Sequence, residues 1–375
     1  MSQSDNTPIP VSILTGFLGS GKTTLLNKLL KDPSMSNAAV IINEFGDVGI
    51  DHLLVETADD NVFEMASGCL CCTVRGDLVD TLINLIERRD KGDIKTFDRV
   101  VIETTGLADP APVLHTIMNH PYLLERYKLE GVVTVVDAVN GDNTLNAHRE
   151  AVKQVAVADR LVLTKADLLT GKKGEDQLFA IIARLKQINK GARILEATTG
   201  EASPDNLFNT GLYDPKTKSN NVERWLAADA YDKPSHSHAH HEHDDHGHEH
   251  DVNRHDSHIQ SFTVTSNKAI TKWNLDLFLE LLRSYHGPNL LRVKGIIKLE
   301  ESPDQPMVIH GVQHIFHPPA QLDKWPDKDT STRIVFITKD IKRAQLSELF
   351  KAFTDPVRGG ADAFRDDTLS LKGAD

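Results

Sequence analysis

Short runs of apolar and β-branched residues recur along the first 200 residues, and longer segments with helical spacing lie between them. The longer segments carry leucines three or four positions apart, as at Leu25 and Leu29, which predicts amphipathic helices. Continuously apolar strands that alternate with helices are typical of a parallel sheet covered on both faces. The six runs that predict strands lie at 11–14, 38–42, 100–102, 132–136, 161–163 and 194–195.

The pattern changes after residue 215. Ten of the 18 histidines lie between positions 236 and 258, interleaved with Asp, Glu, Ser and Gly. This composition offers almost nothing to bury and predicts a disordered linker. Alternation resumes at 261–265 and predicts a strand. The remaining predicted elements are a helix with Trp273, Leu277 and Leu281, strands within 291–299, 307–316 and 333–337, and a helix through Leu346 and Phe350.

These patterns predict an α/β protein of two ordered domains, since a chain of 375 residues is longer than a single domain with one hydrophobic core usually is. Residues 1–215 form a parallel-sheet domain with helices on both faces, and 216–258 form the His-rich linker. Residues 259–355 form a smaller α/β domain, and 356–375 form a flexible tail. In parallel sheets of this kind, ligands bind beyond the carboxyl ends of the strands, so the functional residues are expected to follow each strand.

Composition narrows the class of protein. The net charge of -12 argues against a nucleic-acid binder, because no broad basic surface remains to meet phosphates. There is no run of 18 apolar residues to cross a membrane, and the polar start MSQSDNTPIP does not resemble a secretory signal. The three cysteines are clustered and odd in number, which suits thiolate chemistry in a reducing compartment. We therefore expect a cytoplasmic protein.

The segment GFLGSGKT at 16–23 matches the phosphate-loop pattern G-x-x-x-x-G-K-[ST] in full. It follows the first predicted strand and precedes a helix, as a phosphate loop does. A glycine turn that matches the pattern by chance would need no such context. Backbone N–H groups of such a loop cradle phosphates, and the helix N-terminus favours their charge. Lys22 is expected to reach the β- and γ-phosphates, and the Thr23 hydroxyl to ligate Mg²⁺. The nucleotide-binding residues predicted here are Gly16, Gly19, Ser20, Gly21, Lys22, Thr23 and Thr24.

An acidic residue, Glu103, ends the predicted strand at 100–102 and is followed by Thr-Thr-Gly106. Nucleotide hydrolases place a Mg²⁺ carboxylate and the loop that senses the γ-phosphate at this point. Glu103 is thus predicted to bind Mg²⁺ with Thr23, and Gly106 to lie at the γ-phosphate; Lys22, Thr23 and Glu103 are the predicted catalytic residues. Read alone, Glu103 is also consistent with a polar strand end.

The segment TKAD at 164–167 follows a later strand and resembles the guanine-reading pattern N-K-x-D, with Thr164 in place of Asn. Asp167 is predicted to accept hydrogen bonds from the guanine N1–H and 2-amino groups, which adenine does not supply. Lys165 is predicted to pack along the base. GTP is therefore favoured over ATP, and a small-molecule kinase is the alternative.

A cluster of three thiols, Cys69, Cys71 and Cys72, lies between the second and third predicted strands. Thiolates are good ligands for Zn²⁺, and Co²⁺ is also possible, with a fourth ligand from elsewhere. Glu44, at the end of the second strand, either joins this site, assists at the nucleotide, or is an ordinary capping or solvated acid. Buried small residues and a redox-active thiol pair are alternatives for the cysteines. The His tract is a low-affinity metal binder or a solubilising segment.

Together these segments resemble the CobW-type P-loop GTPases, relatives of the nickel-enzyme maturation factors UreG and HypB. The resemblance covers nearly the whole chain except the His-rich linker. The matching segments are GFLGSGKTT at 16–24, INEFGDVGID at 42–51, GCLCC at 68–72, ETTGLADP at 103–110, TKAD at 164–167, LLRVKGIIKL at 290–299, HGVQHIF at 310–316 and WP at 325–326.

The resemblance implies GTP hydrolysis coupled to delivery of a divalent metal to a client metalloprotein. Cys69, Cys71 and Cys72 would be the main ligands, with Glu44 as a helper and Zn²⁺ as the favoured metal. Cobalt delivery for cobalamin synthesis, a His-tract metal buffer and a redox switch are the alternatives. The C-terminal domain is expected to recognise the client, and the protein to be a monomer or a weak homodimer.

Overall fold

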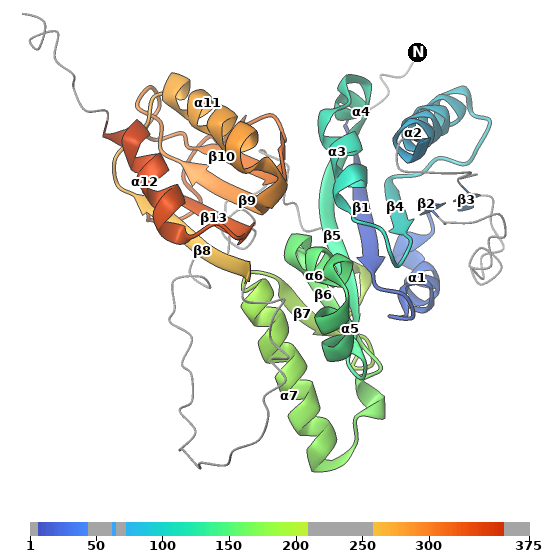
Figure 1. Cartoon of the computed structure of the whole chain (residues 1–375). Helices are drawn as coiled ribbons and strands as arrows, with labels where there is room; N and C mark the ends of the chain where they lie inside the picture. The colour runs from blue at the N-terminus through green and yellow to red at the C-terminus, as the bar shows by residue number, and fades with distance from the viewer. Residues whose placement is uncertain (1–6, 44–61, 65–72, 209–257, 356–375) are drawn as a thin grey trace, which may run out of the picture.

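A computed structural model describes residues 7–43, 62–64, 73–208 and 258–355. These residues form a seven-stranded parallel sheet flanked by helices, followed by a smaller domain around an antiparallel sheet (Figure 1). The predicted fold class is confirmed. The predicted linker and tail lie almost entirely outside the described residues, so the domain boundaries there stay predictions.

The parallel sheet has the strand order β3-β2-β4-β1-β5-β6-β7, and all its neighbours pair in parallel. All six predicted strands are present. The additional strand, β3, has only three residues, too few for a hydrophobic pattern to be recognised. The strands are β1 (Ile9–Gly16), β2 (Ala38–Asn43), β3 (Val62–Glu64), β4 (Arg99–Thr104), β5 (Tyr127–Asp137), β6 (Arg160–Thr164) and β7 (Arg193–Glu196).

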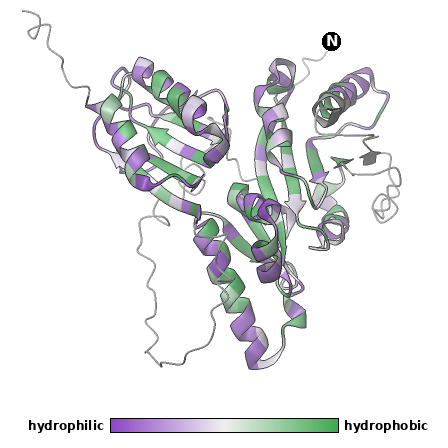
Figure 2. Cartoon of the chain, in the orientation of Figure 1, coloured by the Kyte–Doolittle hydropathy of each residue, from purple (hydrophilic) through white to green (hydrophobic). Residues whose placement is uncertain are grey.

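Helices cover both faces of this sheet. The chain moves from β1 to β2 in one direction and from β4 through β7 in the other, so right-handed crossovers place helices on opposite faces. Apolar side chains consequently line both faces, and every residue of β4 is buried. Figure 2 colours the strands of this sheet mostly as hydrophobic. The helices are α1 (Lys22–Leu30), α2 (Thr73–Lys91), α3 (Ala111–Asn119), α4 (Pro121–Arg126), α5 (Gly141–Ala147), α6 (Arg149–Val157), α7 (Gly171–Ile188) and α8 (Pro204–Leu207).

The C-terminal domain packs two helices on a twisted antiparallel sheet of order β11-β10-β9-β13-β8, with β12 paired to β10. Phe278 and Phe350 meet edge to face, with ring centroids 5.1 Å apart, and join the two helices. The strands are β8 (Ile259–Ser266), β9 (Leu290–Ile297), β10 (Met307–Val312), β11 (Ile315–Phe316), β12 (Ala320–Gln321) and β13 (Thr332–Lys339), and the helices are α11 (Lys272–Leu281) and α12 (Arg343–Thr354).

Helix α11 lies where the sequence predicts a helix, but a different face is buried. Trp273 is 76% exposed and Leu277 is 43% exposed. The buried stripe consists of Leu275, Phe278 and Leu279. Both stripes have helical spacing, so periodicity alone does not tell which of them faces the sheet.

A buried ionic cluster joins the two domains. Asp159, which follows α6, accepts hydrogen bonds from Arg292 (2.7 Å) and Lys294 (2.8 Å) of β9 and from the backbone N–H of Val132 (3.0 Å). Burial raises the pKa of Asp159, but the two cations outweigh this effect and hold the pKa far below its ordinary value. The domain interface therefore depends on an ionised carboxylate.

No helix in the described ranges is long and apolar enough to cross a membrane.

Replacing Asp159 by Asn should destabilise the protein by about 3–5 kcal/mol, because two buried cations lose their partner. Since the pKa of Asp159 is lower in the folded state, its contribution is present above the unfolded-state value of about 4 and is lost as the pH falls below it. Urea unfolding between pH 7 and pH 3 should therefore show a shallower acid loss in Asp159→Asn than in the wild type.

The matched control is Asp90→Asn, which removes a partly exposed ion pair with Arg126. That variant should shift stability by less than about 1 kcal/mol. Equal effects of the two substitutions would contradict the importance of the buried cluster.

Candidate nucleotide-binding site

The phosphate loop connects β1 to α1 in a conformation that side chains would obstruct. A Cβ atom at Gly16, whose φ is 144°, would collide with the carbonyl oxygen of Val135. Gly21 precedes α1 with φ 91° and contributes no side-chain cap, so no capping side chain occupies the first N–H groups of α1. Lys22 is 8% exposed, and its ammonium donates to the Phe17 carbonyl oxygen at 3.3 Å. The arrangement suits an anion at the helix N-terminus.

Thr23 and Glu103 meet beside this loop. The Thr23 hydroxyl donates to Glu103 Oε1 at 2.9 Å, and Glu103 is 3% exposed. The contact follows from the pairing of β1 with β4, in which Leu14 lies opposite Glu103. A hydroxyl and a carboxylate are the hard oxygen ligands that Mg²⁺ prefers, so the pair fits this ion. When bound, Mg²⁺ would neutralise charge on the phosphates.

The loop 105–110 packs directly on the phosphate loop. A Cβ atom at Gly106 would lie 2.5 Å from the amide nitrogen of Leu18. Only glycine allows this approach, and it places the loop that follows Glu103 against the residues expected to hold phosphates. The carbonyl oxygens of Gly106 and Ala108 accept hydrogen bonds from Gln154 of α6.

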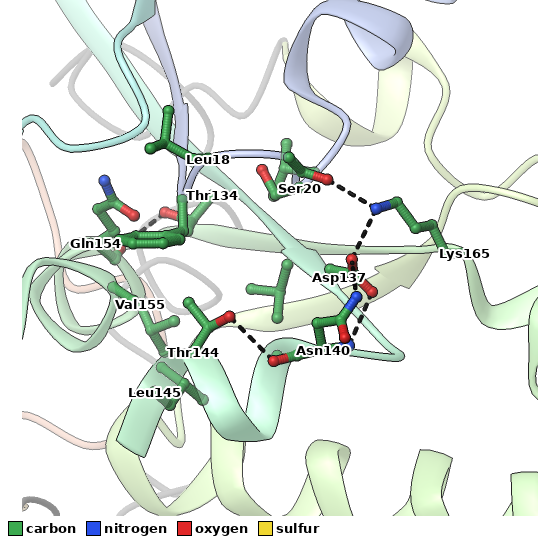
Figure 3. A pocket seen from close by; sticks show the side chains of 16 residues that line it. Leu18, Ser20, Thr134, Asp137, Asn140, Thr144, Leu145, Gln154, Val155 and Lys165 are labelled. Carbon is green, nitrogen blue, oxygen red and sulfur yellow. Dashed lines mark hydrogen bonds and ion pairs between the residues drawn. The ribbon is translucent and has the colours of Figure 1, made fainter. Parts of the chain in front are cut away.

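Strand β6 is tied to the phosphate loop from the other side. The Thr164 hydroxyl donates to the Ser20 carbonyl oxygen at 2.6 Å. The next residue, Lys165, has a positive φ of 58° and donates to the Gly19 carbonyl oxygen at 2.8 Å (Figure 3). Thr164 thus contacts the loop backbone. Asp167, the residue predicted to read the base, is exposed in the 3₁₀ helix Ala166–Leu168.

Asp137, at the end of β5, is a site residue that was not predicted. Its Oδ2 accepts a hydrogen bond from Lys165 at 2.7 Å, and Asn140 donates from both its backbone and its side chain. Burial raises the pKa of Asp137, but the hydrogen bonds from Lys165, Asn140 and Val139 hold the pKa below its ordinary value. Asp137 could have been predicted from the sequence, because it is an acid at the end of a buried strand, the same signal that identifies Glu103.

A cavity of about 300 Å³ lies beside the phosphate loop, between β5, α5 and α6 (Figure 3). Lys165, Asp137 and Asn140 line its polar end, while Leu145 and Val155 line its apolar part. It lies next to the loop that is expected to hold the phosphates, on the side of the sheet away from α1.

The predicted residues gather at one edge of the sheet, at or just after the carboxyl ends of β1, β4 and β6. They are the residues predicted between 16 and 24, with Glu103, Gly106, Lys165 and Asp167. Glu44, Cys69, Cys71 and Cys72 lie outside the described residues. Within the described ranges, no group of three or more His, Cys, Asp or Glu side chains is arranged to hold a metal ion.

Fold and site together define a P-loop nucleotide-binding protein with a second, antiparallel domain. Residues 10–196 match the model of the CobW/HypB/UreG nucleotide-binding domain, and residues 259–354 match the CobW C-terminal domain. The chain belongs to the CobW/HypB/UreG family of P-loop GTPases.

Two proteins named zinc chaperones are similar to this chain over nearly their full length. The zinc chaperone YjiA of Escherichia coli is 33% identical, with 92% of this chain and 98% of that protein aligned. The zinc chaperone CobW of Pseudomonas aeruginosa is 33% identical, with 90% of each aligned. The crystal structure of zinc-bound YjiA GTPase from E. coli superposes with a TM-score of 0.65 at 30% identity, covering 92% of this chain and 99% of that one.

Substituting Gly106 by Ala should lower kcat/KM for GTP by about tenfold or more, because the new Cβ atom would force the two loops apart. Steady-state phosphate release measures this change. Gly92→Ala is the control for a loss of stability remote from the site: Gly92 follows α2, and its φ of 77° strains an alanine, but no atom lies within 4 Å of its added Cβ. Unchanged hydrolysis in Gly106→Ala would show that the loop contact is dispensable.

Proposed function

We propose that this chain is a GTP-hydrolysing metallochaperone. In this proposal Cys69, Cys71 and Cys72 bind Zn²⁺, Glu44 assists, and the metal passes to a client metalloprotein. The similarity to zinc chaperones over nearly the whole chain supports zinc as the cargo. The chemistry of the donors agrees, because thiolates favour Zn²⁺ over hard cations.

The observation that carries the proposal is the position, along the chain, of Glu44 and of the cysteine segment (residues 69–72). Both follow strands of the sheet that holds the candidate nucleotide site. In the pairing of β2 with β4, Asn43 lies opposite Thr104, the residue after Glu103. Glu44 is the residue that follows Asn43 in the chain. The cysteine segment comes after β3, and Cys72 directly precedes α2. Both segments therefore come after strands, β2 and β3, whose carboxyl ends lie at the edge of the parallel sheet where Thr23 and Glu103 meet.

This connectivity supports a coupling between the nucleotide and the metal. The γ-phosphate and Mg²⁺ are expected to bind at Lys22, Thr23 and Glu103, and hydrolysis removes one of these groups. Any change in the positions of Glu44 or the cysteines between the two nucleotide states then alters the affinity for Zn²⁺. The effect is reciprocal, so zinc also changes the affinity for nucleotide.

Zinc affinity should differ about 5- to 150-fold between the complexes with Mg²⁺–GDP and with Mg²⁺ and a non-hydrolysable GTP analogue. Competitive titration of the full chain against a zinc chelator measures both constants. The variant Cys71→Ser should lose the high-affinity site and the nucleotide dependence, while a variant lacking 236–250 should keep both.

Two results would contradict this mechanism. Equal zinc affinities in the two nucleotide states would remove the coupling. Loss of tight zinc binding only on deletion of 236–250 would favour a metal buffer attached to a GTPase. The same titration with Co²⁺ separates zinc delivery from cobalt delivery.

The assignment of guanine to Asp167 predicts a change of nucleotide preference. In Asp167→Asn the amide NH₂ faces the groups that guanine offers as donors, so the affinity for GTP should fall at least about tenfold. Xanthine carries an oxygen in place of the 2-amino group, so XTP should be hydrolysed in preference to GTP.

Hydrolysis rates with GTP, XTP and ATP measure the preference, and Asp176→Asn, an exposed acid of α7, is the control. If the wild type hydrolyses ATP as well as GTP, Asp167 does not read guanine and the kinase alternative is favoured.

A further inference from the structure

Helix α6 holds the loop 105–110 through a buried amide. The side-chain nitrogen of Gln154 donates to the Gly106 carbonyl oxygen at 3.2 Å and to the Ala108 carbonyl oxygen at 3.0 Å. Gln154 is 1% exposed, and its backbone carbonyl oxygen accepts a hydrogen bond from Thr134 of β5 at 2.7 Å. The side-chain amide of Gln154 thus donates both of its N–H groups to backbone carbonyl oxygens of the loop that follows Glu103.

The residue before it provides a second tie. Lys153 donates to Asp109 Oδ2 at 2.8 Å, while Asp109 Oδ1 accepts from the backbone N–H of Ala111, the first residue of α3. Both ends of the loop are therefore attached to α6. The helix also contacts the phosphate loop, because His148, which precedes α6, stacks on Phe17 with ring centroids 4.3 Å apart.

The same helix carries the C-terminal domain. Helix α6 packs against β9, and Leu291 is buried in the apolar cluster that contains Val152 and Val155. Asp159, two residues after the end of α6, makes the buried contacts with Arg292 and Lys294. A displacement of α6 would therefore move β9 or break these contacts.

Helix α3, on the other side of the loop, contacts the same domain. His115 lies 2.9 Å from the Val312 carbonyl oxygen and meets the His314 ring edge to face. Val312 is buried in the apolar cluster formed with α3, and Gln313 lies 3.5 Å from Asp109. The loop 105–110 is thus held between two helices that both pack on the β9–β11 segment (residues 290–316).

We propose that Gln154 is a positioning residue for GTP hydrolysis, and that α6 and α3 transmit the state of the loop 105–110 to the C-terminal domain. Gln154 keeps the loop against Leu18, where Gly106 can meet the γ-phosphate. When the loop changes between the GTP and GDP states, the two helices and the β9–β11 segment respond. The coupling is energetic and reciprocal, so the C-terminal domain also acts on hydrolysis.

The test uses two substitutions of similar size in the full-length protein, without zinc. Gln154→Glu places an oxygen where the donating nitrogen was, and Gln154→Met keeps the shape without any donor. Both should lower kcat for GTP about 10- to 100-fold, because two buried hydrogen bonds are lost. KM should stay within about twofold, since the phosphate loop and Asp167 are untouched.

Hydrogen–deuterium exchange of peptides within the β9–β11 segment (residues 290–316) provides the readout of transmission. In the wild type, exchange should differ between the Mg²⁺–GDP state and the state with a non-hydrolysable GTP analogue. Both Gln154 variants should lose this difference. The control is Gln177→Met, which removes a comparable bond, from Gln177 Nε2 to the Val139 carbonyl oxygen at 2.8 Å, without touching the loop. It should keep both kcat and the exchange difference.

Three outcomes would overturn the proposal. Unchanged kcat in both variants would show that Gln154 does not position the loop. A loss of activity that simply follows a lowered thermal midpoint, with KM raised in parallel, would mean that its role is structural. Identical exchange of residues 290–316 in the two nucleotide states of the wild type would exclude transmission. Because zinc is absent, none of these results bears on the proposed metal delivery.

Discussion

The parallel alignment of the strands is the constraint on which the site depends. Because neighbouring strands run in the same direction, the chain emerges from β1, β4, β5 and β6 at one edge. Residues far apart in the sequence then come within hydrogen-bond distance, as Thr164 and Ser20 do, which are 144 positions apart. Each contact is short because the backbone register, rather than side-chain flexibility, determines the separation.

The second constraint is the ionised Asp159 at the domain interface. A carboxylate removed from water is stable only if cations and donors surround it, and here they come from β9 and from the backbone of β5. Such a contact tolerates little variation in geometry. The two domains are therefore positioned by electrostatics as well as by apolar packing, and a helix that lies between them can act on both.

Local patterns in the sequence account for much of this structure. The phosphate loop, the six longer strands and Glu103 could be predicted because each signal is contained in a few adjacent residues. Gln154 could not, since its partners lie 46 to 48 positions earlier and a lone glutamine in a helix carries no pattern. Asp137 was missed although its signal was present. The exposed side of α11 was ambiguous because two apolar stripes share one period.

The interface also bears on residues 209–257, which lie in the sequence between the described parts of the two domains. Where buried contacts set the relative position of two domains, a connecting segment needs only to span the distance. Its entropic cost grows slowly, by about 0.6 kcal/mol for each doubling of length. Insertions, deletions and compositional drift in such a segment are therefore nearly neutral for folding. A chain built in this way can accumulate histidines in such a segment without redesigning either domain.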